Sequence, residues 1–243
     1  MTDLSGSSYR TLLHTRGFAA IRFGLPLCIG FAALFYIFPS IDIEFSKLFY
    51  QSASNESATS GSGFVQLKSL AVLFRLVDIA SRVALIGAAI VLIVALIRRH
   101  RHRVVAAFIC MGLIAGPTLA INAGLKDHWH RARPRDLIEF GGTKRFTPAW
   151  VISDQCIQNC SFASGHAAAG FAPVIGHFVS RRRLWLTGGL LLGFGVGLAR
   201  VAVGAHFLSD VIFAFLVVYL VYGLLALAMG KQEKFTQPHA QKN

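Results

Sequence analysis

The sequence predicts an all-α membrane protein: a single domain over residues 1–243 with six transmembrane helices in one bundle. Hydrophobic residues make up 54% of the chain and charged residues 14%, whereas soluble proteins carry about 25% charged residues. Apolar residues also gather in blocks, and a helix needs about 20 of them to cross the hydrocarbon core of a bilayer. This composition excludes a disordered, collagen-like or disulfide-rich secreted chain.

Six apolar blocks are long enough, or nearly long enough, to span. In order, they cover about residues 18–38, 80–97, 104–125, 164–179, 184–203 and 206–229. No small-residue cleavage site follows the first block, so we expect it to remain as a helix. The fourth block is short and rich in small residues. Residues 64–82 mix charged and apolar side chains at helical spacing, which predicts an interfacial segment before the second span.

Basic residues in the short loops predict the orientation. They precede the first span, separate the second from the third and the fourth from the fifth, and follow the sixth. These four segments fall on one side of a six-span topology, and the positive-inside rule makes that side cytoplasmic. Both terminal tails, residues 1–17 and 230–243, are therefore expected inside, and the long loop 126–163 on the opposite side.

The net charge of +13 and the pI near 10.3 would suggest a nucleic-acid partner in a soluble protein. Here the basic residues alternate with apolar blocks. They are better explained as loop charges that orient the spans and contact anionic phospholipid headgroups. We therefore expect no nucleic-acid partner.

The loop 126–163 departs from the charge rule. It places six basic residues on the side that disfavours them: Lys126, Arg131, Arg133, Arg135, Lys144 and Arg145. A bound anion would explain them. The alternative is a solvated loop whose basic residues pair with its own acidic residues, and charge alone does not decide between the two.

A first polar cluster bridges the last two spans. If the sixth span starts near His206, then Asp210 lies one helical turn further on, where its carboxylate can hold one imidazole nitrogen. His206 is then a candidate nucleophile, because an oriented neutral imidazole can attack phosphorus. The alternative is a His–Asp pair used only for packing. Arg200 favours the functional interpretation, because a guanidinium at this depth calls for an anion or a water-filled cavity.

A second cluster opens the fourth span. Ser164 is a good N-cap residue, and Gly165 allows an anion to approach the main chain. His166 can then act as a general acid to a leaving oxygen. The alternative is an ordinary helix cap.

A third cluster follows the third span. Lys126 and Arg133 are seven residues apart, so they can share a helix face, and Pro134 then ends the turn. Two fixed positive charges suit the binding of a phosphoryl group. The remaining basic side chains are interpreted as an interfacial helix end, Arg131 and Arg135, and as local hydrogen-bonding groups, His128 and His130.

Together the clusters resemble the three-part signature of the type 2 phosphatidic acid phosphatase superfamily. The matching strings are Lys126-x6-Arg133-Pro134, Ser164-Gly165-His166 and Arg200-x5-His206-x3-Asp210. The resemblance runs from the third span to the sixth, about half the chain. Two positions depart from the pattern, because Ala163 replaces a proline and Ala199 a serine, which puts the geometry of the loop before Ser164 in doubt.

The resemblance implies hydrolysis of a phosphomonoester or a diphosphate through a phosphohistidine, with no metal and no cofactor. His206 would be the nucleophile, Asp210 its orienting partner and His166 the general acid. The groups implied to hold the phosphoryl group are Lys126, Arg133, Ser164, Gly165 and Arg200.

Strings outside the signature look like the branch that contains bacterial lipid A phosphatases, the 4′-phosphatases most closely and the 1-phosphatases second. They are Phe38-Pro-Ser-Ile-Asp42, Leu48-Phe-Tyr50, Phe140-Gly-Gly142 and Ser153-Asp-Gln-Cys156-x3-Cys160-Ser-Phe162. This branch implies a phosphorylated lipid substrate in the bacterial inner membrane and an active site on the periplasmic side.

Two of the four cysteines, Cys156 and Cys160, lie in that outer loop. A disulfide is expected in an oxidising compartment. Zinc is the alternative, but it would need further Cys or His ligands. Cys28 and Cys110 fall inside spans and are interpreted as packing residues, and the glycines of residues 188–197 are interpreted as sites of close helix contact.

Three other functions remain open. An isoprenyl diphosphate or phosphatidylglycerol phosphate phosphatase would use the same catalytic groups. A small proton or anion transporter would use His166, Arg200 and Asp210 as a relay, although the two halves of the chain show no inverted repeat. A basic membrane scaffold leaves Arg200 and Asp210 without a role.

Overall fold

The computed structural model describes residues 6–51, 63–100, 102–126 and 128–230. Apart from two isolated bridges, these residues form helices and loops, so the all-α prediction is confirmed. In chain order the helices are α1 (Gly6–Ile37), α2 (Ser40–Lys47), α3 (Lys68–Ile97), α4 (Arg103–Leu113), the π-helix η1 (Ile114–Lys126), the 3-10 helices η2 (Pro134–Asp136) and η3 (Ile138–Phe140), α5 (Gly165–Phe171), the 3-10 helix η4 (Ala172–Val174), α6 (Ile175–Val179), α7 (Leu184–Ala202) and α8 (Leu208–Gly230).

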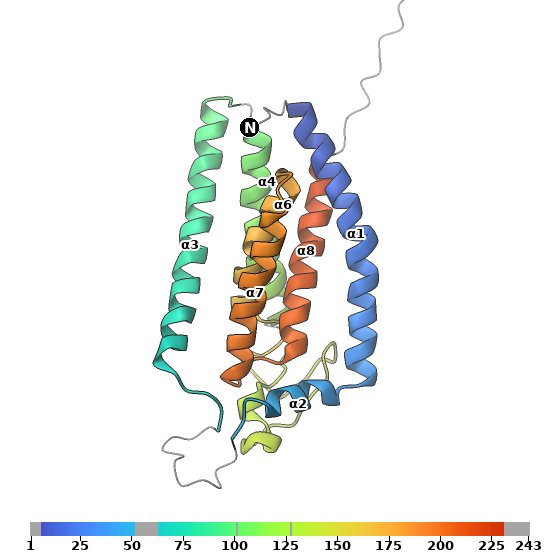
Figure 1. Cartoon of the computed structure of the whole chain (residues 1–243), viewed down its shortest axis with the longest axis vertical. Coiled ribbons are helices and arrows are strands. Elements are labelled where there is room, and N and C mark those ends of the chain that lie inside the picture. Colours follow the sequence, from blue (N-terminus) through green and yellow to red (C-terminus); the bar gives the residue numbers. More distant parts are fainter. Residues whose placement is uncertain (1–5, 52–62, 101, 127, 231–243) are drawn as a thin grey trace, which may run out of the picture.

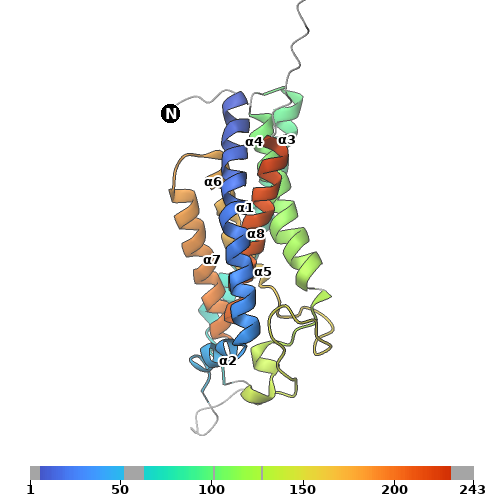
Figure 2. The same ribbon diagram turned by 90° about the vertical axis from the view of Figure 1, so that its right-hand side faces the viewer.

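The long helices run side by side along one axis (Figure 1). Helices α1 and α8 are neighbours in both views (Figures 1 and 2). In the most apolar stretch of α8, 44% of the residues are buried, against 6% in α3. Helix α8 is therefore a central helix and α3 a peripheral one. The helix α2 and the loop after η1 lie together at one end of the bundle, opposite the start of α1 (Figure 1).

Within the described residues, five helical stretches are long and apolar enough to cross a membrane: Ser8–Ile37, Lys68–Ile97, Arg103–Lys126, Leu184–Ala202 and Leu208–Gly230. The predicted fourth span is instead broken into α5, η4 and α6, with Pro173 inside the 3-10 turn. Proline cannot donate a backbone hydrogen bond, which favours a break here. The total of six spans stays a prediction.

The predicted interfacial segment 64–82 is wrong. Helix α3 is continuous for 30 residues from Lys68, so the charged residues Arg75, Asp78 and Arg82 belong to the first half of a candidate span. No proline interrupts these residues, so nothing in the chain separates an interfacial helix from the span. The start of α3 thereby reaches the end of the bundle that carries α2 (Figure 1).

Other boundaries also differ from expectation. Helix α1 begins at Gly6, inside the predicted tail 1–17, whereas nearly all of the tail 230–243 lies outside the described residues. Helix η1 ends at Lys126, and Arg133 has extended backbone (φ −86°, ψ 154°). The two side chains therefore do not share a helix face.

The basic turns gather at the end of the bundle where α1 starts. Arg98 and Arg99 follow α3, and Arg181–Arg183 lie between α6 and α7; both turns lie at that end (Figure 1). This arrangement is the one expected if that end faces the cytoplasm.

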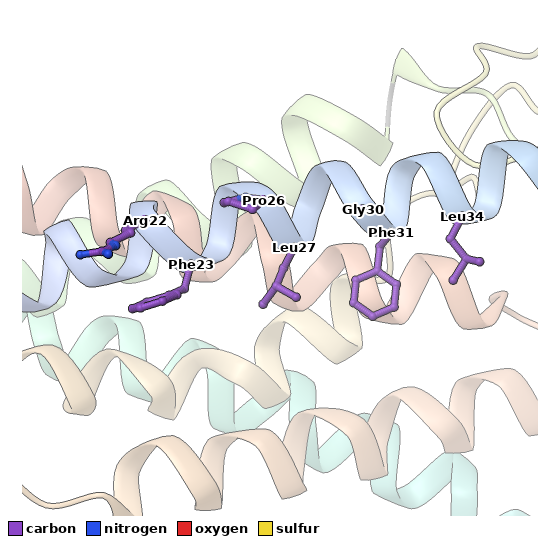
Figure 3. Close-up of a pocket in the computed structure, with 7 residues that line it drawn as sticks. All are labelled: Arg22, Phe23, Pro26, Leu27, Gly30, Phe31 and Leu34. Carbon is purple, nitrogen blue, oxygen red and sulfur yellow. The ribbon is translucent and has the colours of Figure 1, made fainter.

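The outer surfaces of α1 and α3 are apolar. Phe23 on α1 is 62% exposed and Ile97 on α3 is 77% exposed, as expected for side chains that face lipid. Seven residues of α1 line an apolar groove of about 500 Å³, and Figure 3 shows Phe23, Leu27 and Phe31 projecting to the same side of the helix. No residue of the polar clusters lines this groove.

Glycines on α7 allow close helix contact, as predicted. A Cβ atom at Gly189 would lie 2.6 Å from Val174, and one at Gly193 would overlap the buried ring of Phe171. By contrast, a Cβ atom at Gly195 would meet no atom within 4 Å. Gly193 and Gly195 therefore form a matched pair for a stability test.

Gly193→Ala should destabilise the protein by about 1–3 kcal/mol, because the added methyl group forces Phe171 to move within a packed core. Gly195→Ala should leave stability unchanged or raise it by up to about 1 kcal/mol, because alanine favours a helix. Thermal unfolding in detergent measures both. Equal midpoints for the two variants would contradict the packing of α7 described above.

Candidate active site

Helix α7 ends, and helix α8 begins, at the end of the bundle that carries α2 (Figure 1). Arg200 lies in the last turn of α7, and Asp210 in the first turn of α8. His206 lies in the turn between these helices, two residues before α8 rather than at its start. Ser164 is the N-cap of α5. Residues from separate parts of the sequence thus approach one region.

His206 has a defined tautomer. It is 1% exposed, and its Nδ1 atom lies 2.7 Å from the carbonyl oxygen of Ser161. A carbonyl oxygen only accepts hydrogen bonds, so Nδ1 carries the hydrogen and Nε2 keeps its lone pair. Burial lowers the pKa of His206 to about 4, although Asp210 acts in the opposite direction. The imidazole is therefore neutral at pH 7, with Nε2 available as a nucleophile.

Asp210 is fully buried and accepts hydrogen bonds from two residues that lie next to His206. Its Oδ2 atom accepts hydrogen bonds from the Ser161 hydroxyl at 2.5 Å and the Phe207 amide at 2.8 Å. The same oxygen lies 3.5 Å from His206 Nδ1. The shortest contact of Nδ1 is thus with Ser161, and Asp210 acts on the ring chiefly through the two residues that it holds.

The start of α5 approaches the same region. The Ser164 hydroxyl accepts from the Ala167 amide at 3.4 Å, and the Ser164 amide donates to the main-chain oxygen of Asp210 at 3.2 Å. A Cβ atom at Gly165 would overlap Asn122 Oδ1, so any larger residue there would displace the Asn122 side chain. His166 Nε2 lies 3.3 Å from Asp78 Oδ1.

Positive charge converges on both histidines. Arg133 and Arg200 act electrostatically on His206, and both, with Lys126, act on His166. Arg133 donates to the carbonyl oxygen of Asn159 through Nε at 3.0 Å and Nη2 at 2.5 Å.

Arg200 has unused hydrogen-bonding capacity. Its Nε atom is buried and has no hydrogen-bond partner among the described residues. Its guanidinium lies over the ring of Phe74, 4.5 Å from the centroid. Buried donors are normally paired with protein groups, water or ligand, so this region can accept an anion.

The position of Arg131 differs from the interfacial helix end that the sequence predicts. Arg131 is fully buried rather than interfacial, and it donates to Asp210 Oδ1 at 2.6 Å and to Asp42 Oδ2 at 2.8 Å. The physical reason is that Asp42 and Asp210 compensate its charge where the loop after η1 meets α2 and α8. Arg135, in contrast, is exposed as expected.

His128 makes the local hydrogen bond expected of it, whereas His130 bonds to the distant loop residue Cys156. Their Nδ1 atoms lie 2.8 Å and 2.9 Å from the carbonyl oxygens of Gly124 and Cys156, respectively.

Three further residues of the site were not identified from the sequence. Asp42 and Ser161 stand inside strings that were used only for the resemblance, and Asp78 was assigned to an interfacial segment. The signal that identifies Asp78 is a carboxylate within an apolar helix, which is costly in a membrane unless it serves a site.

Cys156 and Cys160 form a disulfide in the loop that leads to Ser164, as predicted. Cys28 and Cys110 are free thiols on α1 and α4. Within residues 6–51, 63–100, 102–126 and 128–230, no group of three or more His, Cys, Asp or Glu side chains is arranged to hold a metal ion.

Comparison with known proteins gives concordant results. The model of the PAP2 superfamily matches residues 103–234. The chain is 33% identical to the lipid A 4′-phosphatase of Francisella tularensis subsp. novicida (strain U112) over 219 residues, which cover 88% of this chain and 97% of the relative.

Two Rhizobium lipid A 4′-phosphatases are similarly related. The Rhizobium leguminosarum protein is 32% identical, with 83% of this chain and 93% of the relative covered. The Rhizobium etli (strain ATCC 51251 / DSM 11541 / JCM 21823 / NBRC 15573 / CFN 42) protein is 33% identical, with 83% and 84% covered. No solved structure shows a significant match.

His206 should stay neutral well below the usual histidine range. In spectra of protein with ¹⁵N-labelled histidine, its signals should keep the Nδ1–H tautomer from pH 8 to about 5.5 and titrate near pH 4, because burial disfavours the cation. The His206→Gln variant assigns the signal. A midpoint near 6.5, or an Nε2–H tautomer, would contradict the geometry described here.

Proposed function

The chain belongs to the PAP2 superfamily and is a phosphomonoester hydrolase, and from this premise we propose that it removes the 4′-phosphate of lipid A. The observation that carries the proposal is the buried neutral His206, which keeps Nε2 unprotonated beside the charges of Arg133 and Arg200. Because the family is one of phosphatases, we no longer consider the two alternatives of a small transporter and a basic membrane scaffold.

The first step is attack of His206 Nε2 on phosphorus. The N–P bond forms while the bond from phosphorus to the ester oxygen breaks. Lys126, Arg133 and Arg200 stabilise the charge on the phosphoryl oxygens. The imidazole gains positive charge, which the carboxylate of Asp210 stabilises.

His166 handles the proton. As the imidazolium it donates its Nδ1 proton to the leaving oxygen in the first step. As the neutral imidazole it then accepts a proton from the attacking water in the second step, which restores the imidazolium. That water releases inorganic phosphate and restores neutral His206. Asp78, 3.3 Å from His166 Nε2, orients the ring, so Nδ1 is the nitrogen that exchanges the proton. The residues in these roles need no cofactor and no metal.

An apolar cleft supports a lipid substrate. It has a volume of about 420 Å³ and is lined by residues of α3, α4, α5, α7 and the segment between α5 and α7. Its lining residues Leu76 and Val77 directly precede Asp78, and Ala169 and Gly170 lie about one turn after His166. An acyl chain in this cleft would therefore start close to the candidate phosphoryl site.

The names of the relatives favour lipid A over other lipids. The same catalytic groups would also serve a lipid A 1-phosphatase or a phosphatase of phosphatidylglycerol phosphate or isoprenyl diphosphates. The basic turns at the opposite end of the bundle support an active site on the periplasmic face of the inner membrane and cytoplasmic termini.

Purified protein in detergent with excess EDTA should release phosphate from lipid A, and the product mass and fragmentation should show loss of the 4′-phosphate alone. Phosphatidylglycerol phosphate and undecaprenyl diphosphate, offered side by side, should react much more slowly. Equal release from all three lipids would refute the lipid A assignment, and activity abolished by EDTA would refute the metal-independent mechanism.

His206→Ala should lower kcat by about 10³-fold or more, because the N–P bond can no longer form. His128→Ala is the matched control, since His128 is exposed and its Nδ1 atom lies 2.8 Å from the Gly124 carbonyl oxygen. It should retain nearly full activity. A folded His206→Ala protein with wild-type kcat would refute the nucleophile assignment.

A further inference from the structure

A buried charge network joins Asp210 to Arg131 and Asp42, two residues without a catalytic role in the scheme above. Arg131 is its centre, with Nη1 2.6 Å from Asp210 Oδ1 and Nη2 2.8 Å from Asp42 Oδ2. Its Nε donates to the Thr147 carbonyl at 2.8 Å. All three charged side chains are at most 1% exposed. The guanidinium is thus shared between carboxylates on two different helices.

Asp42 ties α2 to the start of α8. Its Oδ1 atom accepts from the Ser209 amide at 2.9 Å, and its Oδ2 atom accepts from the Ser209 hydroxyl at 2.5 Å as well as from Arg131. A carboxylate in this place is favoured by the unpaired amides and the positive dipole end of α8. Both oxygens of Asp42 are therefore occupied by groups that precede or hold Asp210.

Arg131 also fixes the residue that accepts the His206 hydrogen bond. The Arg131 carbonyl accepts from the Ser161 amide at 2.8 Å, and the Ser161 carbonyl accepts from His206 Nδ1 at 2.7 Å. The Ser161 hydroxyl donates to Asp210, which Arg131 holds from the other side. Movement of Arg131 would displace both partners of the imidazole.

We propose that Asp42 and Arg131 are positioning residues for phosphoryl transfer: they fix Ser161 and Asp210, and through them the direction of His206 Nε2. The inference rests on the proposed role of His206 as nucleophile. Neither residue touches the substrate.

The charges of the network support the same role. The carboxylate of Asp210, held by Arg131, lies 3.5 Å from His206 Nδ1 and compensates the positive charge that His206 gains when the N–P bond forms. A buried ion pair is a weak source of stability compared with apolar packing. The network can orient His206 through hydrogen bonds, and apolar side chains in the same place could not.

Asp42→Asn keeps the shape of the side chain but leaves too few acceptors for Ser209 and Arg131 together. We expect kcat to fall about 10- to 100-fold with KM changed less than about 2-fold, because misplacement of an attacking group acts on the reaction rather than on binding. The rate is measured on lipid A and on the soluble phosphomonoester p-nitrophenyl phosphate.

Arg131→Lys should retain more activity than Arg131→Gln, since the ammonium group keeps the charge but cannot bridge two carboxylates as the guanidinium does. The matched control is Glu44→Gln, on the same helix as Asp42, which removes an exposed ion pair to Lys47 at 2.7 Å. This control should have wild-type kcat, because exposed ion pairs contribute little.

Ser209→Ala is a second, smaller change, in case Asp42→Asn does not fold. It removes the hydroxyl that donates to Asp42 and accepts from Arg131 Nη1 at 2.9 Å, and it leaves both charged side chains in place. It should lower kcat less than Asp42→Asn does, again with little change in KM. A folded Asp42→Asn protein with wild-type kcat would overturn the inference. If Asp42→Asn does not fold, wild-type kcat in Ser209→Ala would overturn it instead. A rise in KM without a fall in kcat would also overturn it.

The two substrates distinguish failure of the proposed function from failure of the positioning role. Wild-type protein that cleaves p-nitrophenyl phosphate but not lipid A would refute the lipid substrate and leave the positioning role to be decided by the variants on the soluble ester. Wild-type protein inactive on both would refute the proposed function and, with it, the positioning role.

Discussion

The hydrogen bond from His206 Nδ1 to the Ser161 carbonyl is the interaction on which the site depends. It fixes the tautomer and leaves Nε2 unprotonated in a region from which water is largely excluded. The bond joins two separate segments, the loop before α5 and the turn between α7 and α8. The buried carboxylate of Asp210 holds both segments, so the orientation of one ring requires most of this end of the bundle to be in place.

The bundle combines two different environments, an apolar outer surface and a cluster of buried charges at one end. Apolar helix surfaces such as that of α3 suit a lipid environment, whereas buried charges at one end need compensation. Asp42 and Asp210 compensate Arg131 internally. Arg200 Nε has no hydrogen-bond partner within the described ranges, and we propose that it binds an external anion. In the proposed function a phosphorylated lipid would satisfy both conditions, because its phosphate would bind near the cations while its acyl chains would stay with the apolar surface.

The helices and the reactive groups could be predicted because each leaves a local signal: an apolar block for α8, and characteristic spacing for Arg200, His206 and Asp210. Arg131 could not be placed, since burial of an arginine depends on how the loop after η1 folds back onto α2. Asp42 leaves no local signal either, because its partner Ser209 is far away in the sequence. The continuity of α3 could not be predicted because charged residues in its first half are also typical of an interfacial helix. The position of Asp78 beside His166 is a tertiary feature.

A trapped phosphoenzyme is the most direct test of His206 as the nucleophile. Lipid A carrying radioactive phosphate at the 4′ position is mixed with the purified protein and the reaction is quenched in alkali within milliseconds. We expect a labelled protein whose phosphate is stable to alkali, is lost in acid and maps to the peptide that contains His206. Label on another residue, or no labelled protein in samples quenched while the enzyme is turning over lipid A, would contradict the account.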